Sequence, residues 1–201
     1  MECKLSVIIP VYNQEELVIR AIKSVPCRND VEIIVIDDYS TDNTLLELRD
    51  FQKRTDYNLV VLANDKNQGV GYTVNRGLDV ATGEYVVLLG SDDYFVNLDK
   101  CIDFIFDDKV DLIYFDLEIN DGSFWKLSEE SKWGLCGSTK FMRREFIGET
   151  REPEMRQGED WYFYRDLMAK NPTEKFVNRN VVYKHYNFPR EGSLTWIASN
   201  K

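Results

Sequence analysis

The first half of the chain alternates between short apolar runs and longer segments in which apolar residues recur every three or four positions. Near-continuous apolar runs are typical of strands buried on both faces, and the wider spacing indicates amphipathic helices. Strands are therefore predicted at 5–9, 31–36, 59–62, 85–89 and 112–115, with helices at 15–25, 45–51, 70–81 and 98–106. This alternation predicts the α/β class, with a mostly parallel central sheet and helices on both faces.

The second half of the chain has a weaker pattern. After about residue 117, glycines interrupt a stretch of polar and aromatic residues, which predicts loops up to residue 158. A helical spacing returns at 159–170, and short apolar runs at 175–177 and 181–183 predict two more strands. A length of 201 residues is near the usual size of one domain, so we expect a single domain over 1–201.

The net charge narrows the class of partner. The chain carries a formal net charge of -10, which is a poor match for nucleic acid or for anionic lipid. We therefore expect a small ligand and no nucleic-acid partner. An anionic ligand would need a local device in so acidic a protein, such as a helix N-terminus, an arginine or a bound cation.

The cysteines and the apolar runs bear on the compartment. Cys3, Cys27, Cys101 and Cys136 are widely spaced, without a CxxC pair, and are typical of reduced thiols in a cytoplasmic protein. No stretch approaches the ~20 apolar residues of a membrane span, and the N-terminus does not read as a signal peptide. We expect a cytoplasmic protein without a transmembrane segment. Peripheral attachment to the inner face of a membrane stays open, because it needs only a surface patch.

Polar and aromatic residues follow three of the predicted strands. Ligands of open parallel sheets bind outside the carboxyl ends of the strands, where this sequence has Tyr12, the pair Asp37 and Asp38, and the pair Asp92 and Asp93. A tyrosine can stack on a base, and a carboxylate can accept an N–H group or hold Mg²⁺ or Mn²⁺. Each aspartate alone is also typical of a turn or a helix cap. Their repetition at neighbouring strand ends favours a nucleotide site.

Four longer segments carry a family resemblance. They are LSVIIPVYN (5–13), EIIVIDDYSTDNT (32–44), NQGVGYTVNRGLDVATGEYVVLLGSDD (67–93) and GEDWYFYRDL (158–167). With these segments the chain resembles glycosyltransferase family 2, whose members have the GT-A fold, a Rossmann-like sheet. The resemblance implies metal-dependent transfer of a sugar from a nucleotide donor, usually UDP-linked, to an acceptor hydroxyl with inversion. It also implies a role in polysaccharide or glycolipid synthesis.

The resemblance assigns roles to matching residues. Residues 1–117 would bind the nucleotide, and 118–201 would bind the acceptor and supply the catalytic base, Asp160, with Glu159 beside it. Mn²⁺ or Mg²⁺ would be held by Asp92, Asp93 and His185. The donor site would comprise Pro10, Tyr12, Asn13, Glu15, Asp37, Asp38, Asn67, Gly69, Asn75, Ser91 and Asp92. Within it, Tyr12 and Asp38 would border the uracil.

Several of these assignments have alternatives. Glu159 or Asp160 is also typical of a helix cap, and a lone histidine such as His185 is as often structural. Weaker candidates for diphosphate contacts are Lys184, Arg190 and Ser193, and for a sugar-stacking floor Trp125 and Trp133.

Three positions depart from the family pattern. Gly90 replaces the first acidic residue of the usual Asp-x-Asp motif, Tyr39 replaces a small residue, and Val74 replaces a common arginine. Two rival functions stay open, the first suggested by Gly90 and the second by the shared sheet architecture. One is a degenerate module that binds a nucleotide sugar without turnover. The other is a sugar nucleotidyltransferase, which builds the nucleotide sugar.

Overall fold

The computed structural model describes residues 2–127, 137–155 and 158–188. The strands are β1 (Leu5–Val11), β2 (Val31–Asp37), β3 (Leu59–Ala63), β4 (Tyr85–Leu88), β5 (Tyr94–Val96), β6 (Leu112–Glu118), β7 (Phe124–Trp125), β8 (Lys140–Arg143), β9 (Glu174–Val177) and β10 (Tyr183–His185). The helices are α1 (Val18–Lys23), α2 (Thr44–Arg54), α3 (Val70–Val80), α4 (Leu98–Cys101), α5 (Arg144–Ile147) and α6 (Glu159–Met168).

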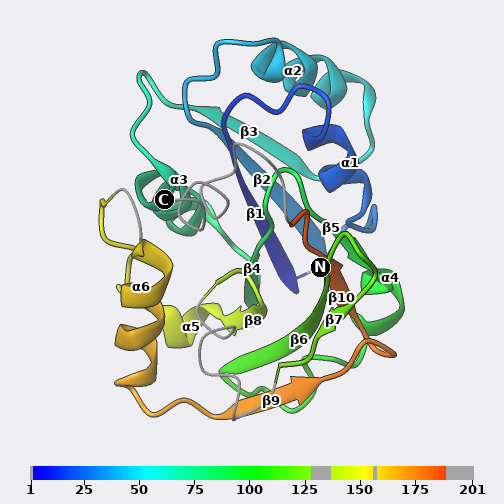
Figure 1. The fold of residues 1–201 in the computed structure, drawn as a ribbon, viewed down its shortest axis with the longest axis vertical. Coiled ribbons are helices and arrows are strands. Elements are labelled where there is room, and N and C mark those ends of the chain that lie inside the picture. Colours follow the sequence, from blue (N-terminus) through cyan, green and yellow to red (C-terminus); the bar gives the residue numbers. More distant parts are fainter. Residues whose placement is uncertain (1, 128–136, 156–157, 189–201) are drawn as a thin grey trace.

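The strands form one sheet with the order β3-β2-β1-β4-β8-β6-β10-β5, and β7 and β9 also pair with β6 (Figure 1). The first four strands run parallel, as do β9 and β10 beside β6. Strand β8 lies antiparallel between β4 and β6, and β5 and β7 are also antiparallel to their neighbours. The predicted mostly parallel sheet is confirmed, with antiparallel pairs in the second half of the chain.

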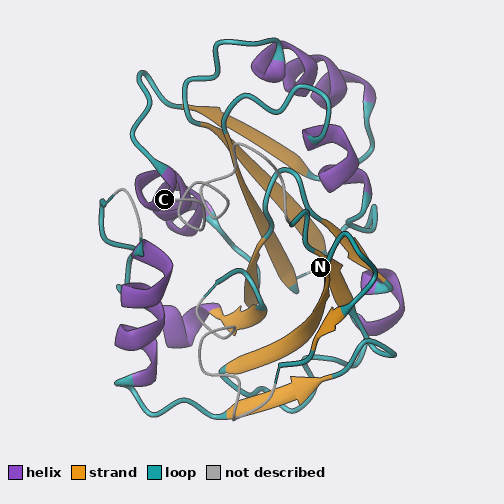
Figure 2. Ribbon diagram, viewed as in Figure 1, coloured by secondary structure: helices purple, strands orange, loops and turns teal. Residues whose placement is uncertain are grey.

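Alternate residues of the central strands face two separate cores. Leu5, Val7 and Ile9 of β1 pack with buried residues of α1, α2 and α4 on one face. Ile8, between them, points to the other face, where Val74 of α3 and residues of α5 and α6 cover the sheet. Because both faces are apolar, the strands read as continuous hydrophobic runs. The prediction of helices on both faces is therefore confirmed (Figure 2).

The structure corrects several predicted boundaries. Helix α1 begins at Val18 instead of Glu15, and α4 ends at Cys101. The apolar residues that predicted a helix to Phe106 lie in turns, where Ile102 and Ile105 are still buried. The last strand lies at Tyr183–His185 instead of 181–183.

The prediction of loops between residues 117 and 158 is wrong in part. This segment contains the rest of β6, then β7, β8 and α5. Strands of two to four residues are too short to establish a period of two, and β8 has the sequence KFMR, with a charge at each end. Their pairing is therefore decided by the neighbouring strands β4 and β6.

Candidate active site

The ends of β1, β2 and β3 meet at one edge of the sheet. In the register of the parallel strands, Val11 lies beside Asp37, and Asp37 lies beside Ala63. The three segments stay side by side just beyond the strand ends. The Asp38 amide donates to the Val11 carbonyl over 2.8 Å, and the Asn64 amide donates to the Asp37 carbonyl over 2.8 Å. This edge is the candidate nucleotide site.

Asp38 is buried and saturated by neighbouring donors. Its Oδ1 accepts from the Asn64 side chain (2.7 Å) and the Gln68 amide (2.8 Å), and its Oδ2 accepts from the Gly69 amide (2.8 Å). Gly69 precedes α3 with φ of +90°, a conformation that favours glycine. Asp38 therefore fixes the loop that starts α3. The prediction that it borders the base stays a prediction.

Asp37 has an open oxygen at the same edge. Its Oδ2 accepts from the Ser40 amide (3.1 Å). Its Oδ1 is buried and has no hydrogen-bond partner within the residues that the structure describes. Leaving a buried acceptor without a donor costs about 1–3 kcal/mol. Of the two aspartates, Asp37 is therefore the one with an oxygen that no described donor satisfies.

Two tyrosines stand at the surface of this edge. Tyr12 is 45% exposed and Tyr39 is 54% exposed. Tyr39 has a φ of +66°, which is uncommon for a residue with a side chain. Both rings are available for stacking, and the replacement of a small residue by Tyr39 adds an aromatic surface beside Asp38.

The remaining predicted donor residues of the first half have other surroundings. The Asn13 side chain accepts from the Thr41 amide (2.8 Å), and the Glu15 carboxylate accepts from the Asn43 amide (2.7 Å). These bonds tie the loop after β1 to the start of α2. Pro10 lies within β1, and Asn67 is exposed.

The end of β4 has little room for a larger residue at position 90. A Cβ atom on Gly90 would lie 2.8 Å from Asp93 Oδ2 and 3.2 Å from Asp92 Oδ1. The first distance is too short for a real contact, so both carboxylates lie over the glycine. The carboxylates of Asp92 and Asp93 thus occupy the space that a side chain at position 90 would need.

Asp93 is committed to a buried ion pair. Its Oδ2 lies 2.9 Å from Lys184 Nζ, and both side chains are nearly inaccessible. Its Oδ1 accepts from the Asn187 amide (2.9 Å). Lys184 also donates to the Ser138 hydroxyl (2.6 Å). Lys184 therefore joins the end of β4 to β10 and to the segment before β8.

His185 does not come together with the aspartates as a metal cluster. Its Nδ1 lies 3.2 Å from Glu118 Oε2, its Nε2 lies 3.1 Å from Asn120 Oδ1, and its ring stacks on Tyr94. Across residues 2–127, 137–155 and 158–188, no three His, Cys, Asp or Glu side chains are arranged to hold a metal. A metal role for His185 stays a prediction.

The divalent cation predicted for this edge has one candidate carboxylate, that of Asp92. Mg²⁺ sites commonly use one or two carboxylates, with substrate phosphates and waters completing the shell. Asp92 is partly exposed, whereas Asp93 and the adjacent Ser91 are buried. Arg20 donates to the Asp92 carbonyl (2.5 Å) and lies over the Tyr94 ring, which holds the backbone of Asp92 in place. Asp92 is the residue that would hold the cation.

Asp160 lies in the first turn of α6. Its Oδ1 accepts from the Trp161 amide (2.8 Å), and its Oδ2 faces Gly137, at 3.6 Å from where a Cβ would stand. The adjacent Glu159 has a buried Oε2 without a partner in the described chain. Burial, and secondarily the charge of Asp160, raises the pKa of Glu159. One oxygen of Asp160 thus accepts from the amide of the next residue and the other faces Gly137, while the N-cap position of α6 is Gly158.

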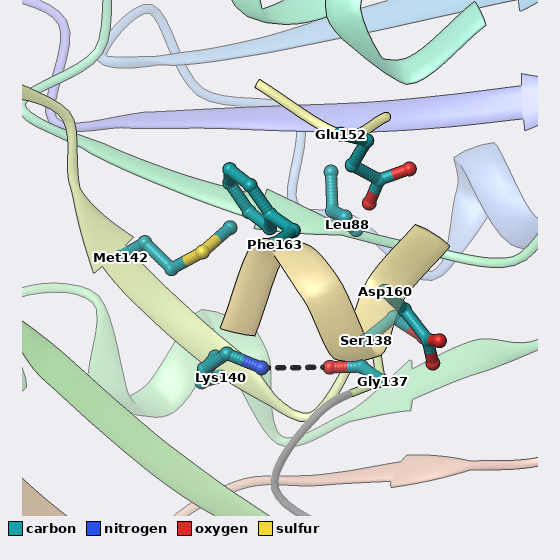
Figure 3. Close-up of a pocket in the computed structure, with 8 residues that line it drawn as sticks. All are labelled: Leu88, Gly137, Ser138, Lys140, Met142, Glu152, Asp160 and Phe163. Carbon is teal, nitrogen blue, oxygen red and sulfur yellow. Dashed lines mark hydrogen bonds between the residues drawn. The ribbon is translucent and has the colours of Figure 1, made fainter. Parts of the chain in front are cut away.

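A small cavity of about 20 Å³ lies next to Asp160. It is lined by Leu88, Gly137, Ser138, Lys140, Met142, Glu152, Asp160 and Phe163 (Figure 3). Two buried lysines bond to residues that line it: Lys140 donates to the Gly137 carbonyl (2.9 Å), and Lys184 donates to the Ser138 hydroxyl. Through Ser138, Lys184 and Asp93, this cavity is connected to the end of β4.

Sequence reasoning missed three participants at this cavity. Lys140 and Ser138 lie around β8, which the sequence did not predict. Glu152 reads as a surface charge among alternating glutamates and arginines, yet it is 4% exposed. Asn75, predicted in the donor site, bonds the backbone of Glu152 at both its N–H and its C=O, each over 2.8 Å. No local pattern in the sequence indicates these contacts, because they join segments that only the tertiary structure brings together.

Some predicted candidates lie outside the described residues. These are Trp133, Arg190 and Ser193. Trp125 is 41% exposed and contacts Tyr186 and Phe188, and Lys184 is buried in its ion pair. In none of the helices of the described chain do length and apolar character reach what a membrane crossing needs.

Comparisons with known proteins find relatives of this chain among glycosyltransferases. A β-1,3-glucosyltransferase of Campylobacter jejuni, named for GalNAc(5)-diNAcBac-PP-undecaprenol, is 42% identical over 45% of the chain, which spans 30% of that protein. An uncharacterized glycosyltransferase of Haemophilus influenzae is 30% identical over 98% of the chain and 82% of its own length.

The fold comparison points the same way. The structure of S. aureus TarS 1-349 in complex with UDP-GlcNAc is 26% identical, with a TM-score of 0.79 over 94% of this chain and 60% of TarS 1-349. The predicted GT-A fold is thereby confirmed. The family described as Glycosyl transferase family 2 matches residues 6–170. The chain therefore belongs to glycosyl transferase family 2.

Proposed function

We propose that the chain is a metal-dependent, inverting glycosyltransferase that uses a UDP-sugar and acts on a hydroxyl of a polysaccharide or glycolipid. The observation that carries this proposal is the connection between two sites. The strand-end edge with Asp37 and Asp92 is joined to the cavity of Asp160 through Asp93, Lys184 and Ser138. A nucleotide bound at the edge would extend its sugar toward that cavity.

The donor would be held by Tyr12, Asp37 and Asp92 at this edge. Tyr12 would stack on the base, and Asp37 Oδ1 would accept the ring N–H of uracil. Asp92 would hold Mn²⁺ or Mg²⁺. A bound cation would offset the negative charge that develops on the leaving diphosphate.

Asp160 would act as the general base. It would take the proton of the acceptor hydroxyl as that oxygen attacks the anomeric carbon, and the bond from this carbon to the diphosphate oxygen would break. A base must be ionised, and the first turn of α6 favours a carboxylate through the helix dipole and the Trp161 amide. Direct attack by the acceptor gives inversion, because the nucleophile enters opposite the leaving group.

The substrate classes are supported by the relatives. The Campylobacter protein is named for an undecaprenol-linked glycan, and TarS 1-349 was crystallised with UDP-GlcNAc. We place the reaction in the cytoplasm, since Cys3, Cys27 and Cys101 are unpaired thiols. A glycolipid acceptor would bring the chain to the inner face of the membrane.

A UDP-release assay tests the proposal. The chain is incubated with Mn²⁺, with UDP-glucose, UDP-galactose, UDP-N-acetylglucosamine or UDP-N-acetylgalactosamine, and with octyl glycosides as acceptors. We expect acceptor-dependent UDP release and a β-linked product, identified by proton NMR, from an α-linked donor. UDP binding without release would instead support the degenerate binding module suggested by Gly90. Consumption of UTP with a sugar phosphate would support a nucleotidyltransferase.

A further inference from the structure

Glu152 is held at the Asp160 cavity by its backbone. The Asn75 side chain of α3 accepts from the Glu152 amide and donates to the Glu152 carbonyl, both over 2.8 Å. The next residue is also pressed against α3, since a Cβ on Gly71 would lie 2.7 Å from the Pro153 carbonyl oxygen. The position of Glu152 is therefore fixed independently of its carboxyl group.

The carboxyl group of Glu152 is buried with one oxygen unpaired. The residue is 4% exposed, and its Oε2 has no hydrogen-bond partner in the described part of the chain. The charged groups that face it are Glu159 and Asp160 of α6 and Lys140 of β8. Burial first, then the charges of Glu159 and Asp160, raise the pKa of Glu152 to about 8, and Lys140 opposes the rise. Glutamate is thus a costly residue at this position.

The cavity beside this carboxyl has the size of one hydroxyl group. Its volume of about 20 Å³ holds one water-sized group, and Asp160 lines it together with Glu152 (Figure 3). Gly137 lines the same cavity, and a side chain there would extend toward Asp160. A whole sugar ring does not fit, whereas a single hydroxyl of a ring bound at the rim does.

We propose that Glu152 recognises one hydroxyl group of a sugar substrate next to the oxygen that Asp160 deprotonates. The hydroxyl would donate to Glu152 Oε2, which the fold leaves without a partner. This inference rests on the proposed function and adds a specificity residue to it. The hydroxyl belongs either to the acceptor or to the transferred sugar, and the two sources are separable by experiment.

A hydroxyl suits the cavity better than a metal ion. The described residues contain no three-ligand metal cluster, and Lys140 brings a positive charge to the same wall. A neutral donor avoids repulsion from this lysine. A carboxyl that loses its ligand hydroxyl is left unpaired, so such sites discriminate strongly against analogues without the group.

The test compares Glu152→Gln and Glu152→Met with wild type, and Glu154→Gln serves as an exposed control two residues away. Calorimetry first gives the affinity for UDP and for each of the UDP-sugars named above. Transfer assays with octyl glycosides then give separate KM values for donor and acceptor. We expect Glu152→Met to bind UDP as the wild type does and to raise one of the two KM values about 10-fold or more. Glu152→Gln, which keeps a hydrogen-bonding oxygen, should recover most of this loss.

The outcome also identifies the source of the hydroxyl. If Glu152→Met raises only the KM for the acceptor, the hydroxyl belongs to the acceptor. If Glu152→Met removes the difference in affinity between a UDP-sugar and UDP, the hydroxyl belongs to the transferred sugar. A deoxy analogue of that sugar should then show no further loss with Glu152→Met. Unchanged KM values in Glu152→Met, with an active wild type, would overturn this inference alone. A wild type that binds no UDP would instead contradict the proposed function.

Thermal unfolding at pH 7.5 gives a readout that needs no acceptor. A buried carboxyl that is paired only when ligand binds destabilises the ligand-free protein. Glu152→Gln and Glu152→Met should therefore raise Tm. Glu154→Gln should leave Tm unchanged. A lower Tm in both Glu152 variants would show that the carboxyl supports the fold, and would overturn the proposal.

Discussion

The acidic residues of the strand-end edge and those beside α6 are treated differently by the fold. At the edge, Asp38 accepts three hydrogen bonds and Asp93 is paired with Lys184. Beside α6, Glu152 and Glu159 each keep a buried oxygen without a partner in the described residues. The comparison teaches that bonded carboxylates shape the loops, and that open ones mark where ligands are expected. Asp37, with one bonded and one open oxygen, has both properties.

The largest effect is expected at Asp160. Replacement by Asn keeps the size of the side chain and its acceptor for the Trp161 amide, and removes the base. We expect kcat for sugar transfer to fall about 10²–10⁴-fold, while UDP binding stays within about twofold. UDP-release kinetics and calorimetry measure the two quantities. A variant with normal kcat would assign the base to another residue of the α6 region.

Replacing Lys184 tests the buried ion pair that Asp93 forms at the edge. Lys184→Met leaves Asp93 buried without its cation, and we expect the free energy of unfolding to fall by about 3–5 kcal/mol. Lys175→Met is the matched control, because its partner Asp108 is 62% exposed, and should cost less than about 1 kcal/mol. Urea denaturation measures both. Equal losses would mean that the buried pair is no more structural than a surface pair.

Glu152 tests the unpaired carboxyl through pH. Its pKa is raised in the folded chain to about 8 from an ordinary value of 4.5, so the folded state binds a proton more tightly than the unfolded state between these values. Wild-type stability should therefore fall as pH rises from about 4.5 to 8. Glu152→Gln should lack this part of the pH dependence and be about 2–4 kcal/mol more stable than wild type at pH 8.5. Denaturation curves at pH 5 and 8.5 give the free energy of unfolding of both proteins. An equal change between the two pH values in wild type and Glu152→Gln would contradict the prediction.

The two aspartates after β2 should differ in a smaller way. Asp37→Asn should lower UDP affinity about 10-fold with little change in stability, because its open oxygen serves the ligand. Asp38→Asn places an amide where donors converge and should cost about 1–3 kcal/mol of stability. Calorimetry and urea denaturation on both variants measure these effects. The reverse assignment would restore Asp38 as the residue that borders the base.

The fold was predictable where a continuous apolar run marks the element. Long apolar strands such as β1 and β2, and their connecting helices, could be predicted because burial on both faces leaves a continuous pattern. Strands β5, β7 and β8 are short, and their pairing depends on neighbours far away in the chain. The family resemblance supplied candidate residues, but it could not show which carboxylate is saturated and which is open. Glu152 was missed because its burial depends on Asn75 of α3, a contact without local signal.

The measurement that tests the account most directly is calorimetric titration with UDP, in Mn²⁺ and in EDTA, on the wild type and on Asp92→Asn, with GDP and ADP as controls. The account predicts UDP binding that needs Mn²⁺, is preferred over GDP and ADP, and weakens at least 10-fold in Asp92→Asn. No UDP binding by folded wild type in either condition would contradict it, and would show that the strand-end edge with Gly90 and Tyr39 is not a UDP-sugar site.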